Sequence, residues 1–177
     1  HMASSALMQN KNVLYITLEM SEERIAERID ANILNIPMKE LPDISKKEYG
    51  KKIGRLKNKT KGKLIVKEYP TASAHVGHFR HVLQELNIKK DFQPDIIFVD
   101  YLNICASQRI RPGAGANSYT LVKSIAEELR GLAVEHDLPI VSATQTTRSG
   151  YGSTDIGLED TSESVSYTHL RAHETVH

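Results

Sequence analysis

The chain alternates between short apolar runs of strand length and longer segments with helical spacing, which restricts the folds open to it. The apolar runs are rich in β-branched and aromatic residues, which favour strands. They span Asn12–Met20, Lys63–Pro70, Pro94–Leu102 and Leu138–Gln145. Strands that alternate with helices are typical of a parallel sheet covered on both faces. We therefore predict an α/β fold with a mainly parallel sheet and helices on both sides.

Between these runs, apolar residues recur every three or four positions, as they do on the buried face of a helix. Ser21 suits the N-cap of one such helix, and Glu22 and Glu23 follow in the first turn, where the helix dipole favours acids. We expect helices after Ser21, over Thr71–Lys90 and from Ser118 onward. A short surface helix is predicted within the lysine-rich segment Ser45–Lys63.

Three of the predicted strands end in polar residues, namely Glu19, Asp100 and Gln145. The carboxyl ends of parallel strands meet at one edge of the sheet, where ligands bind because the following loops diverge. A carboxylate such as Asp100 is a hard oxygen ligand for Mg²⁺, and one such as Glu19 can orient and deprotonate water. The amide of Gln145 is suited to hydrogen-bond a γ-phosphate. Asp100 alone fits a structural role at a strand end better than a catalytic one, but the three residues together indicate a nucleotide site.

Composition limits the class of protein and its partners. The 177 residues are 40% hydrophobic and 25% charged, as in an ordinary single globular domain. The net charge is only +1, so the chain as a whole does not attract polyanions such as DNA. Any contact with DNA must therefore come from local charged patches. The single cysteine, Cys105, excludes an internal disulfide and fits a reducing compartment. No apolar run approaches the roughly 20 residues that span a bilayer. We expect a soluble cytoplasmic protein with no membrane contact.

Several stretches of the chain resemble the DnaB-type replicative helicases, which are RecA-like ATPases, and most closely those of T-even phages. The motifs that carry the resemblance are YITLEMS (Tyr15–Ser21), IIFVDYL (Ile96–Leu102) and the strand-end Gln145 with Arg148. Longer stretches also match, namely RIDANILNI (Arg28–Ile36), GKLIVKEYPT (Gly62–Thr71) and NSYTLVKSIAEELRGLAVE (Asn117–Glu135). The resemblance extends from about Ala6 to Ser164 and implies a RecA-like fold.

The resemblance also implies an activity and a set of roles. In this family the residue that matches Glu19 activates water, the one that matches Asp100 binds Mg²⁺, and those that match Gln145 and Arg148 sense the γ-phosphate. The complete proteins use ATP and Mg²⁺ and form ring-shaped homohexamers that unwind DNA in the five-prime to three-prime direction along single-stranded DNA. The expected location is the cytoplasm of a phage-infected bacterial cell.

Two arginines are candidates for contact with single-stranded DNA. Arg109 and Arg111 lie in the glycine-bearing loop Gln108–Asn117, which follows the strand that ends at Asp100. The corresponding region of the resembling helicases faces the central channel of the ring. Flexible cations suit contact with backbone phosphates. A solvated surface loop without a ligand is an equally good interpretation of the same residues. For the lysine-rich segment Ser45–Lys63, a solvated face is the better interpretation.

One element of a nucleotide site is missing, because no phosphate loop of the form G-x-x-x-x-G-K-[ST] occurs in the chain. Residues 1–5 resemble a purification-tag scar, and residues 165–177 resemble a translated sequencing adapter. We therefore interpret residues 6–164 as part of a helicase motor domain that lacks the phosphate-loop strand. The loss of the main nucleotide anchor predicts that this polypeptide binds no ATP or Mg²⁺ and hydrolyses no ATP.

The missing strand should lie beside Pro139–Thr144, so its loss predicts an exposed apolar strand edge. We expect the chain to self-associate through this edge, or its tail to cover it.

Two other functions remain open from the residues alone: a RecA/RadA-like recombination ATPase, and a non-catalytic binding or scaffold domain of the same fold. The spacing of His75, His78 and His81 favours a hydrated helix face over a zinc site, and Cys105 is expected to be a small core or loop residue.

Overall fold

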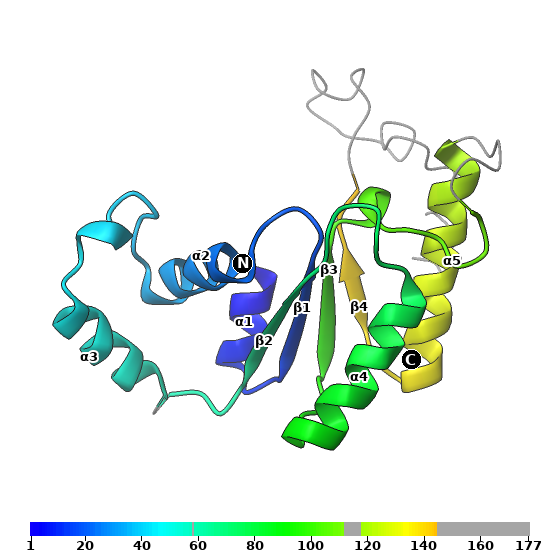
Figure 1. The fold of residues 1–177 in the computed structure, drawn as a ribbon. Coiled ribbons are helices and arrows are strands. Elements are labelled where there is room, and N and C mark those ends of the chain that lie inside the picture. The colour runs from blue at the N-terminus through cyan, green and yellow to red at the C-terminus, as the bar shows by residue number, and fades with distance from the viewer. Residues whose placement is uncertain (58, 112–117, 145–177) are drawn as a thin grey trace, which may run out of the picture.

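The structure is a computed structural model that describes residues 1–57, 59–111 and 118–144. Its centre is a parallel sheet of four strands in the order β2-β1-β3-β4 (Figure 1). The strands are β1 (Val13–Thr17), β2 (Leu64–Glu68), β3 (Ile96–Asp100) and β4 (Ile140–Ser142). The predicted parallel α/β sheet is therefore confirmed.

Helices connect the strands and cover both faces of the sheet (Figure 1). The α-helices are α1 (Met2–Met8), α2 (Glu22–Leu34), α3 (Lys46–Lys57), α4 (Val76–Lys90) and α5 (Ser118–His136). Two short 3-10 helices, η1 (Leu41–Asp43) and η2 (Leu102–Ile104), lie in the connections. Within the described residues, no helix is long and apolar enough to cross a membrane.

The core has two layers, one on each face of the sheet, because successive side chains of a strand point to opposite faces. Leu14 and Ile16 of β1 point into the larger layer, under α4 and α5. Val13, with Phe98 of β3, lies in the smaller layer under α1 and α2. Both central strands are thus buried on their two faces, which explains why their sequences are almost continuously apolar.

Helix α2 begins and ends as its sequence indicates. The Ser21 hydroxyl accepts a hydrogen bond from the backbone N–H of Arg24 (3.3 Å), so the predicted N-cap is confirmed. Asn35 ends the helix in the left-handed conformation, with φ of 53°. Ile25 and Ile29, four positions apart and so on one face of the helix, are buried in the smaller core layer.

The helix predicted over Thr71–Lys90 begins only at Val76, so its predicted start is wrong. The Thr71 hydroxyl donates to the carbonyl of Leu18 (2.7 Å), and the Ala72 N–H donates to the carbonyl of Ile104 (2.8 Å). Ala72 also has a positive φ of 58°, which is incompatible with a right-handed helix. This segment instead links the loops that follow β1 and β3.

The first residues of the chain are part of the fold. Helix α1 begins at Met2, and Ala3, Ser4 and Leu7 are buried. Ala3 and Leu7 pack into the smaller core layer beside Ile25 of α2. The assignment of residues 1–5 to a tag scar remains a prediction, as does that of residues 165–177, which lie outside the described residues.

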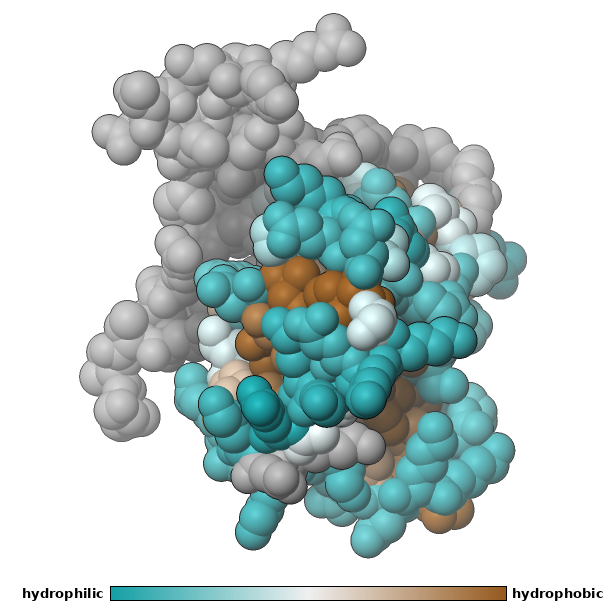
Figure 2. Space-filling view, turned by 90° about the vertical axis from the view of Figure 1, so that its left-hand side faces the viewer, coloured by the Kyte–Doolittle hydropathy of each residue, from teal (hydrophilic) through white to brown (hydrophobic). Residues whose placement is uncertain are grey.

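Helix α3 lies apart from the sheet (Figure 1). Figure 2 looks onto this side of the molecule, where hydrophilic residues cover most of the surface around an exposed hydrophobic area. None of the described residues of α3 belongs to either core layer. The surface helix predicted within Ser45–Lys63 is thus confirmed.

Candidate functional site

Glu19 and Asp100 follow neighbouring strands and lie at the same edge of the sheet. Thr17 at the end of β1 is in register with Asp100 at the end of β3. The next residue, Leu18, donates its backbone N–H to the carbonyl of Asp100 (3.0 Å). Glu19 comes directly after this contact and its side chain is exposed. Both residues therefore lie at the carboxyl ends of adjacent strands, at the edge where the sequence predicts a nucleotide site.

A compact turn carries Glu19. The Thr17 hydroxyl donates to the carbonyl of Met20 (2.9 Å) and accepts from its N–H (3.1 Å). Thr17 is itself fully buried. The turn therefore holds Glu19 outward from a fixed base, and its side chain is exposed to solvent.

Asp100 is half-buried, and a side chain from the adjacent strand orients it. The hydroxyl of Tyr15 donates to Oδ2 of Asp100 (3.0 Å). The Tyr15 ring stacks on Phe98, with ring centroids 6.0 Å apart and an interplanar angle of 18°. Burial, and then the charge and hydrogen bond of Asp100, raise the pKa of Tyr15, so the phenol keeps its proton. A single carboxylate at a strand end fits Mg²⁺, which keeps several waters and takes its other ligands from phosphates.

The third strand end approaches the same edge. The N–H of Leu102 donates to the carbonyl of Ala143 (3.1 Å), and the Thr144 hydroxyl donates to Oδ1 of Asn103 (2.9 Å). The chain that leads to Gln145 thus lies beside the loop that follows Asp100. Gln145 and Arg148 themselves lie outside the described residues.

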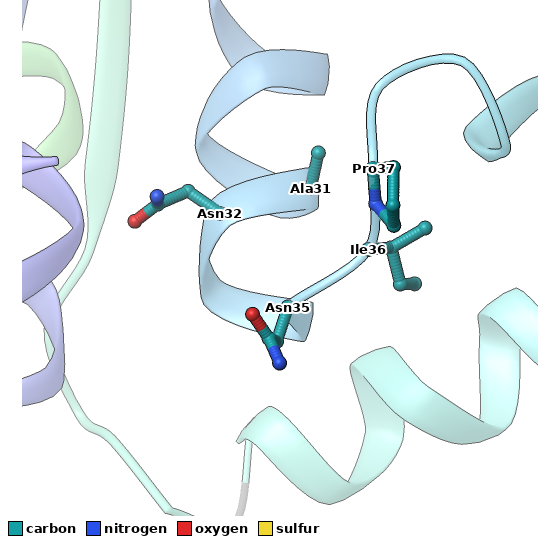
Figure 3. Close-up of a pocket in the computed structure, with 5 residues that line it drawn as sticks. All are labelled: Ala31, Asn32, Asn35, Ile36 and Pro37. Carbon is teal, nitrogen blue, oxygen red and sulfur yellow. The ribbon is translucent and has the colours of Figure 1, made fainter.

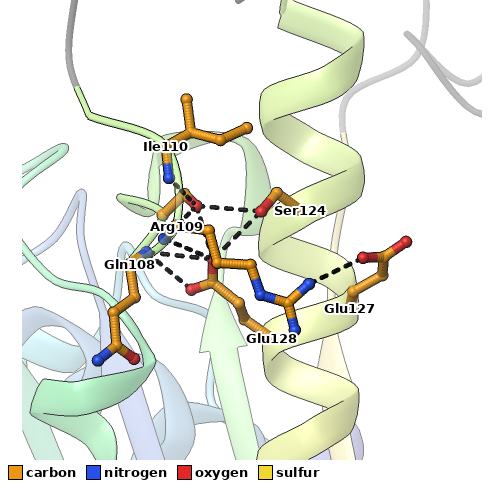
Figure 4. Close-up of polar contacts among 7 residues, drawn as sticks. Gln108, Arg109, Ile110, Ser124, Glu127 and Glu128 are labelled. Atoms are coloured by element: carbon orange, nitrogen blue, oxygen red, sulfur yellow. Dashed lines mark hydrogen bonds and ion pairs between the residues drawn. The ribbon is translucent and has the colours of Figure 1, made fainter. Parts of the chain in front are cut away.

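The two candidate DNA-binding arginines follow η2 in the chain. Figure 4 shows that Arg109 lies beside α5. Arg109 directs its guanidinium toward α5, where Nη1 lies 3.0 Å from Oε2 of Glu127. Arg111 is exposed. Both cations are therefore at the surface, and Arg109 already has an acidic partner.

Comparison with known proteins decides the family. Residues 1–156 match the family model described as the DnaB-like helicase C terminal domain. The chain belongs to this family. The resemblance predicted from the sequence motifs is confirmed, and this match favours a helicase over a recombination ATPase.

Two relatives show how far the similarity to DnaB-like helicases extends. The chain is 48% identical over 167 residues to the DnaB-like replicative helicase of Enterobacteria phage T4, which covers 93% of this chain and 35% of that protein. It is 30% identical over 147 residues to a probable plasmid replicative DNA helicase of Chlamydia trachomatis, which covers 81% of this chain and 30% of that protein. The chain spans about a third of the length of these relatives.

Two solved structures share the fold. One is described as a DnaB-like replicative helicase and its interactions with primase, with a TM-score of 0.68 and 20% identity over 92% of this chain and 39% of that one. The other is described as an ATPase domain, with a TM-score of 0.70 and 18% identity over 92% of this chain and 57% of that one. The RecA-like α/β fold predicted for the chain is therefore confirmed.

Sequence reasoning missed Glu128, which lies on the buried face of α5 in this DnaB-like domain. Its side chain is only 6% exposed, yet it accepts hydrogen bonds from two hydroxyls and two backbone N–H groups. Burial alone raises the pKa of Glu128, but the hydrogen bonds from Ser107, Gln108, Arg109 and Ser124 together outweigh it and lower the pKa. A signal was available, because Glu128 lies three residues after Ile125 and four before Leu132, within the apolar stripe of the helix.

Two other predicted features have structural roles. Nδ1 of His75 accepts from the N–H of Gly77 (3.0 Å), and Nδ1 of His78 accepts from the N–H of His75 (3.2 Å). These two histidines cap the start of α4. Cys105 is buried in the larger core layer, as predicted, and burial raises the pKa of its thiol to about 12.

An open pocket lies at the end of α2 (Figure 3). It is lined by Ala31, Asn32, Asn35, Ile36 and Pro37. None of the predicted site residues is among them, and none of these lining residues carries a charge. The strand-end edge, rather than this pocket, carries the candidate chemistry.

Proposed function

We propose that the chain forms part of the ATP-driven motor of a phage-type replicative DNA helicase. The observation that carries this proposal is the contact between the Leu18 N–H and the Asp100 carbonyl, which brings Glu19 and Asp100 to one sheet edge. The family match and the 48% identity to the phage T4 helicase support it. In the complete protein we expect six copies to encircle single-stranded DNA.

The residues at this edge divide the chemistry between them. Asp100, oriented by Tyr15, is the ligand for Mg²⁺, and Glu19 takes the proton from the attacking water. When bound with ATP, Mg²⁺ would neutralise charge on the phosphates as the terminal bond breaks. Gln145 and Arg148 are proposed to sense the γ-phosphate, and Arg109 and Arg111 to contact the backbone of DNA.

This polypeptide by itself should not turn over ATP, because its sequence lacks the G-x-x-x-x-G-K-[ST] loop that anchors the phosphates. We expect no Mg²⁺-dependent phosphate release above the rate without protein, and no ATP or Mg²⁺ binding by calorimetry. Turnover that Asp100→Ala abolishes would show that the polypeptide is complete enough for catalysis and would overturn this expectation.

A graft tests the proposed roles directly. The matching segment of the phage T4 helicase is replaced by this chain, which the 48% identity over 167 residues makes feasible. We expect the chimera to hydrolyse ATP and unwind DNA, and Glu19→Gln or Asp100→Ala to lower the hydrolysis rate by about 10³-fold or more. Ser142→Ala, at the edge strand, is the control. A chimera that assembles normally but is inactive would favour the non-catalytic scaffold alternative.

A further inference from the structure

Two adjacent glutamates of α5 contact the segment Ser107–Ile110 in different ways (Figure 4). Glu127 is exposed and meets the side chain of Arg109. Glu128 is buried and meets the backbone of the same segment. One helix therefore provides both a side-chain partner and a backbone anchor for a proposed DNA-contacting arginine.

The backbone anchor is a buried carboxylate that donor groups of the loop satisfy. Oε2 of Glu128 accepts from the N–H of Gln108 at 2.9 Å, and Oε1 accepts from the N–H of Arg109 at 3.2 Å. The hydroxyl of Ser107 donates to Oε1 at 2.6 Å. Hydrogen bonds to an ionised acceptor are stronger than neutral ones, and they hold the loop in one conformation.

Ser107 extends the anchor by one residue. Its Oγ accepts from the N–H groups of Arg109 and Ile110, both at 3.1 Å. The backbone N–H groups of residues 108, 109 and 110 are thus all fixed by Glu128, Ser107 or both. Without these acceptors, the segment would have to be ordered when a ligand binds, at a cost in affinity.

The contact between the side chains of Glu127 and Arg109 would weaken DNA binding, whereas the backbone anchor would favour it. Arg109 and Glu127 are 3.0 Å apart, but their side chains are 61% and 51% exposed. Ion pairs this exposed contribute little to stability. A phosphate that binds Arg109 would have to replace Glu127, so this carboxylate competes with the DNA backbone for the guanidinium.

We propose that Glu127 and Glu128 set the strength of single-stranded DNA contact in opposite directions. Glu128 is a positioning residue that presents Arg109 and Arg111, and Glu127 is a competitor that holds Arg109 in the absence of DNA. This inference rests on the proposed contact of these arginines with DNA.

The test uses two matched variants, Glu127→Gln and Glu128→Gln. Each removes one negative charge from neighbouring positions, so a general electrostatic effect would tighten DNA binding in both. The geometry requires opposite effects. Fluorescence anisotropy with a labelled oligothymidine of about 20 nucleotides should show about two- to fivefold tighter binding for Glu127→Gln. Glu128→Gln should bind about three- to tenfold more weakly.

Amide hydrogen exchange provides a readout that does not depend on DNA. Glu128→Gln should speed exchange at Gln108 and Arg109 by about tenfold or more, because these N–H groups lose an ionised acceptor. Exchange in β3 should stay the same, and Glu127→Gln should change neither segment. Should Glu128→Gln not fold, Ser107→Ala keeps the carboxylate and should speed exchange at Ile110 and weaken binding.

The outcomes separate this inference from the proposed function. If the unaltered chain binds no oligothymidine even at about 50 mM salt, the DNA contact itself is wrong. If it binds and both variants bind more tightly, the DNA contact stands and the positioning role of Glu128 is overturned. Unchanged exchange at residues 108–110 in Glu128→Gln would also overturn that role, whether or not DNA binds.

Discussion

At the residue scale, the carboxylate of Asp100, the proposed Mg²⁺ ligand, depends on a partner from the neighbouring strand. Tyr15 is in register with Phe98, and Thr17 with Asp100, so Tyr15 and Asp100 are diagonal neighbours on one face of the sheet. A tyrosine is long enough to span this diagonal. Its hydroxyl reaches Oδ2 of Asp100 at 3.0 Å, while its ring is held by Phe98. The sheet register therefore fixes one oxygen of the carboxylate.

Tyr15→Phe tests this contact. The substitution keeps the ring but leaves Oδ2 of the half-buried Asp100 without its donor, so we expect the free energy of unfolding to fall by about 1 kcal/mol. Urea denaturation at neutral pH measures this loss. Tyr69→Phe is the matched control, because Tyr69 also packs on a phenylalanine ring, that of Phe79. Equal losses in the two variants would mean that the hydrogen bond to Asp100 contributes nothing.

The positions of Glu19 and Asp100 at strand ends could be predicted from the sequence, but the residues that contact them could not. An apolar run that ends in an acid identifies a strand tip, because both features are local in sequence. The contact of Tyr15 with Asp100 joins residues 85 positions apart, and that of Ser107 with Glu128 joins residues 21 apart. Such contacts depend on register and on helix packing, which no local pattern specifies.

At the element scale, strands and helices were predicted better than their ends. All four strands lie inside the predicted apolar runs, but β4 is only Ile140–Ser142 within the predicted Leu138–Gln145. The start of α4 was missed because Thr71 and Ala72 bond to the loops after β1 and β3. Tertiary hydrogen bonds thus override local helical spacing where an element meets the site edge.

Helix α3 is only weakly connected to the rest of the fold, because none of its described residues belongs to either core layer. Its apolar residues Ile53 and Leu56 are only half-buried. Tyr49 donates a hydrogen bond to Oδ2 of Asp30 on α2, and burial, followed by the contact with Asp30, raises the pKa of this phenol to about 12. Few buried contacts mean that a segment opens locally without unfolding the whole domain.

We expect Tyr49→Phe to loosen α3 and little else. Amides of α3 should exchange faster, while the exchange rates of α5 amides should stay the same. The global free energy of unfolding should change by less than about 1 kcal/mol. Hydrogen exchange followed by NMR measures both quantities. Lys52→Gln is a suitable control, because its exposed pair with Glu48 (3.7 Å) contributes little. If α3 exchanges as slowly as α5 in the unaltered protein, the helix is better anchored than its contacts indicate.

At the scale of the whole molecule, the order of the strands determines which edges are available to other chains. The central strands β1 and β3 pair on both sides, whereas β4, within the described residues, pairs only with β3. The Ile97 N–H donates to the carbonyl of Pro139, and the Leu102 N–H to that of Ala143. Because backbone groups of a parallel strand alternate in direction, Ile140 and Ser142 direct theirs away from β3.

This outer edge of β4 should pair with another copy of the chain, as unpaired strand edges do. Ser142→Pro removes an outward N–H without altering the bonds of residues 139 and 143 to β3, and proline is tolerated at such edge positions. Ser142→Ala is the matched control, because it loses the hydroxyl bond to Val99 (2.8 Å) but keeps the N–H. In sedimentation velocity, Ser142→Pro should need about tenfold more protein than Ser142→Ala to associate.

If the unaltered chain is a monomer because residues 165–177 cover the edge, deletion of those residues should make it associate. A chain that stays monomeric with and without residues 165–177 would show that the β4 edge is not an interaction surface.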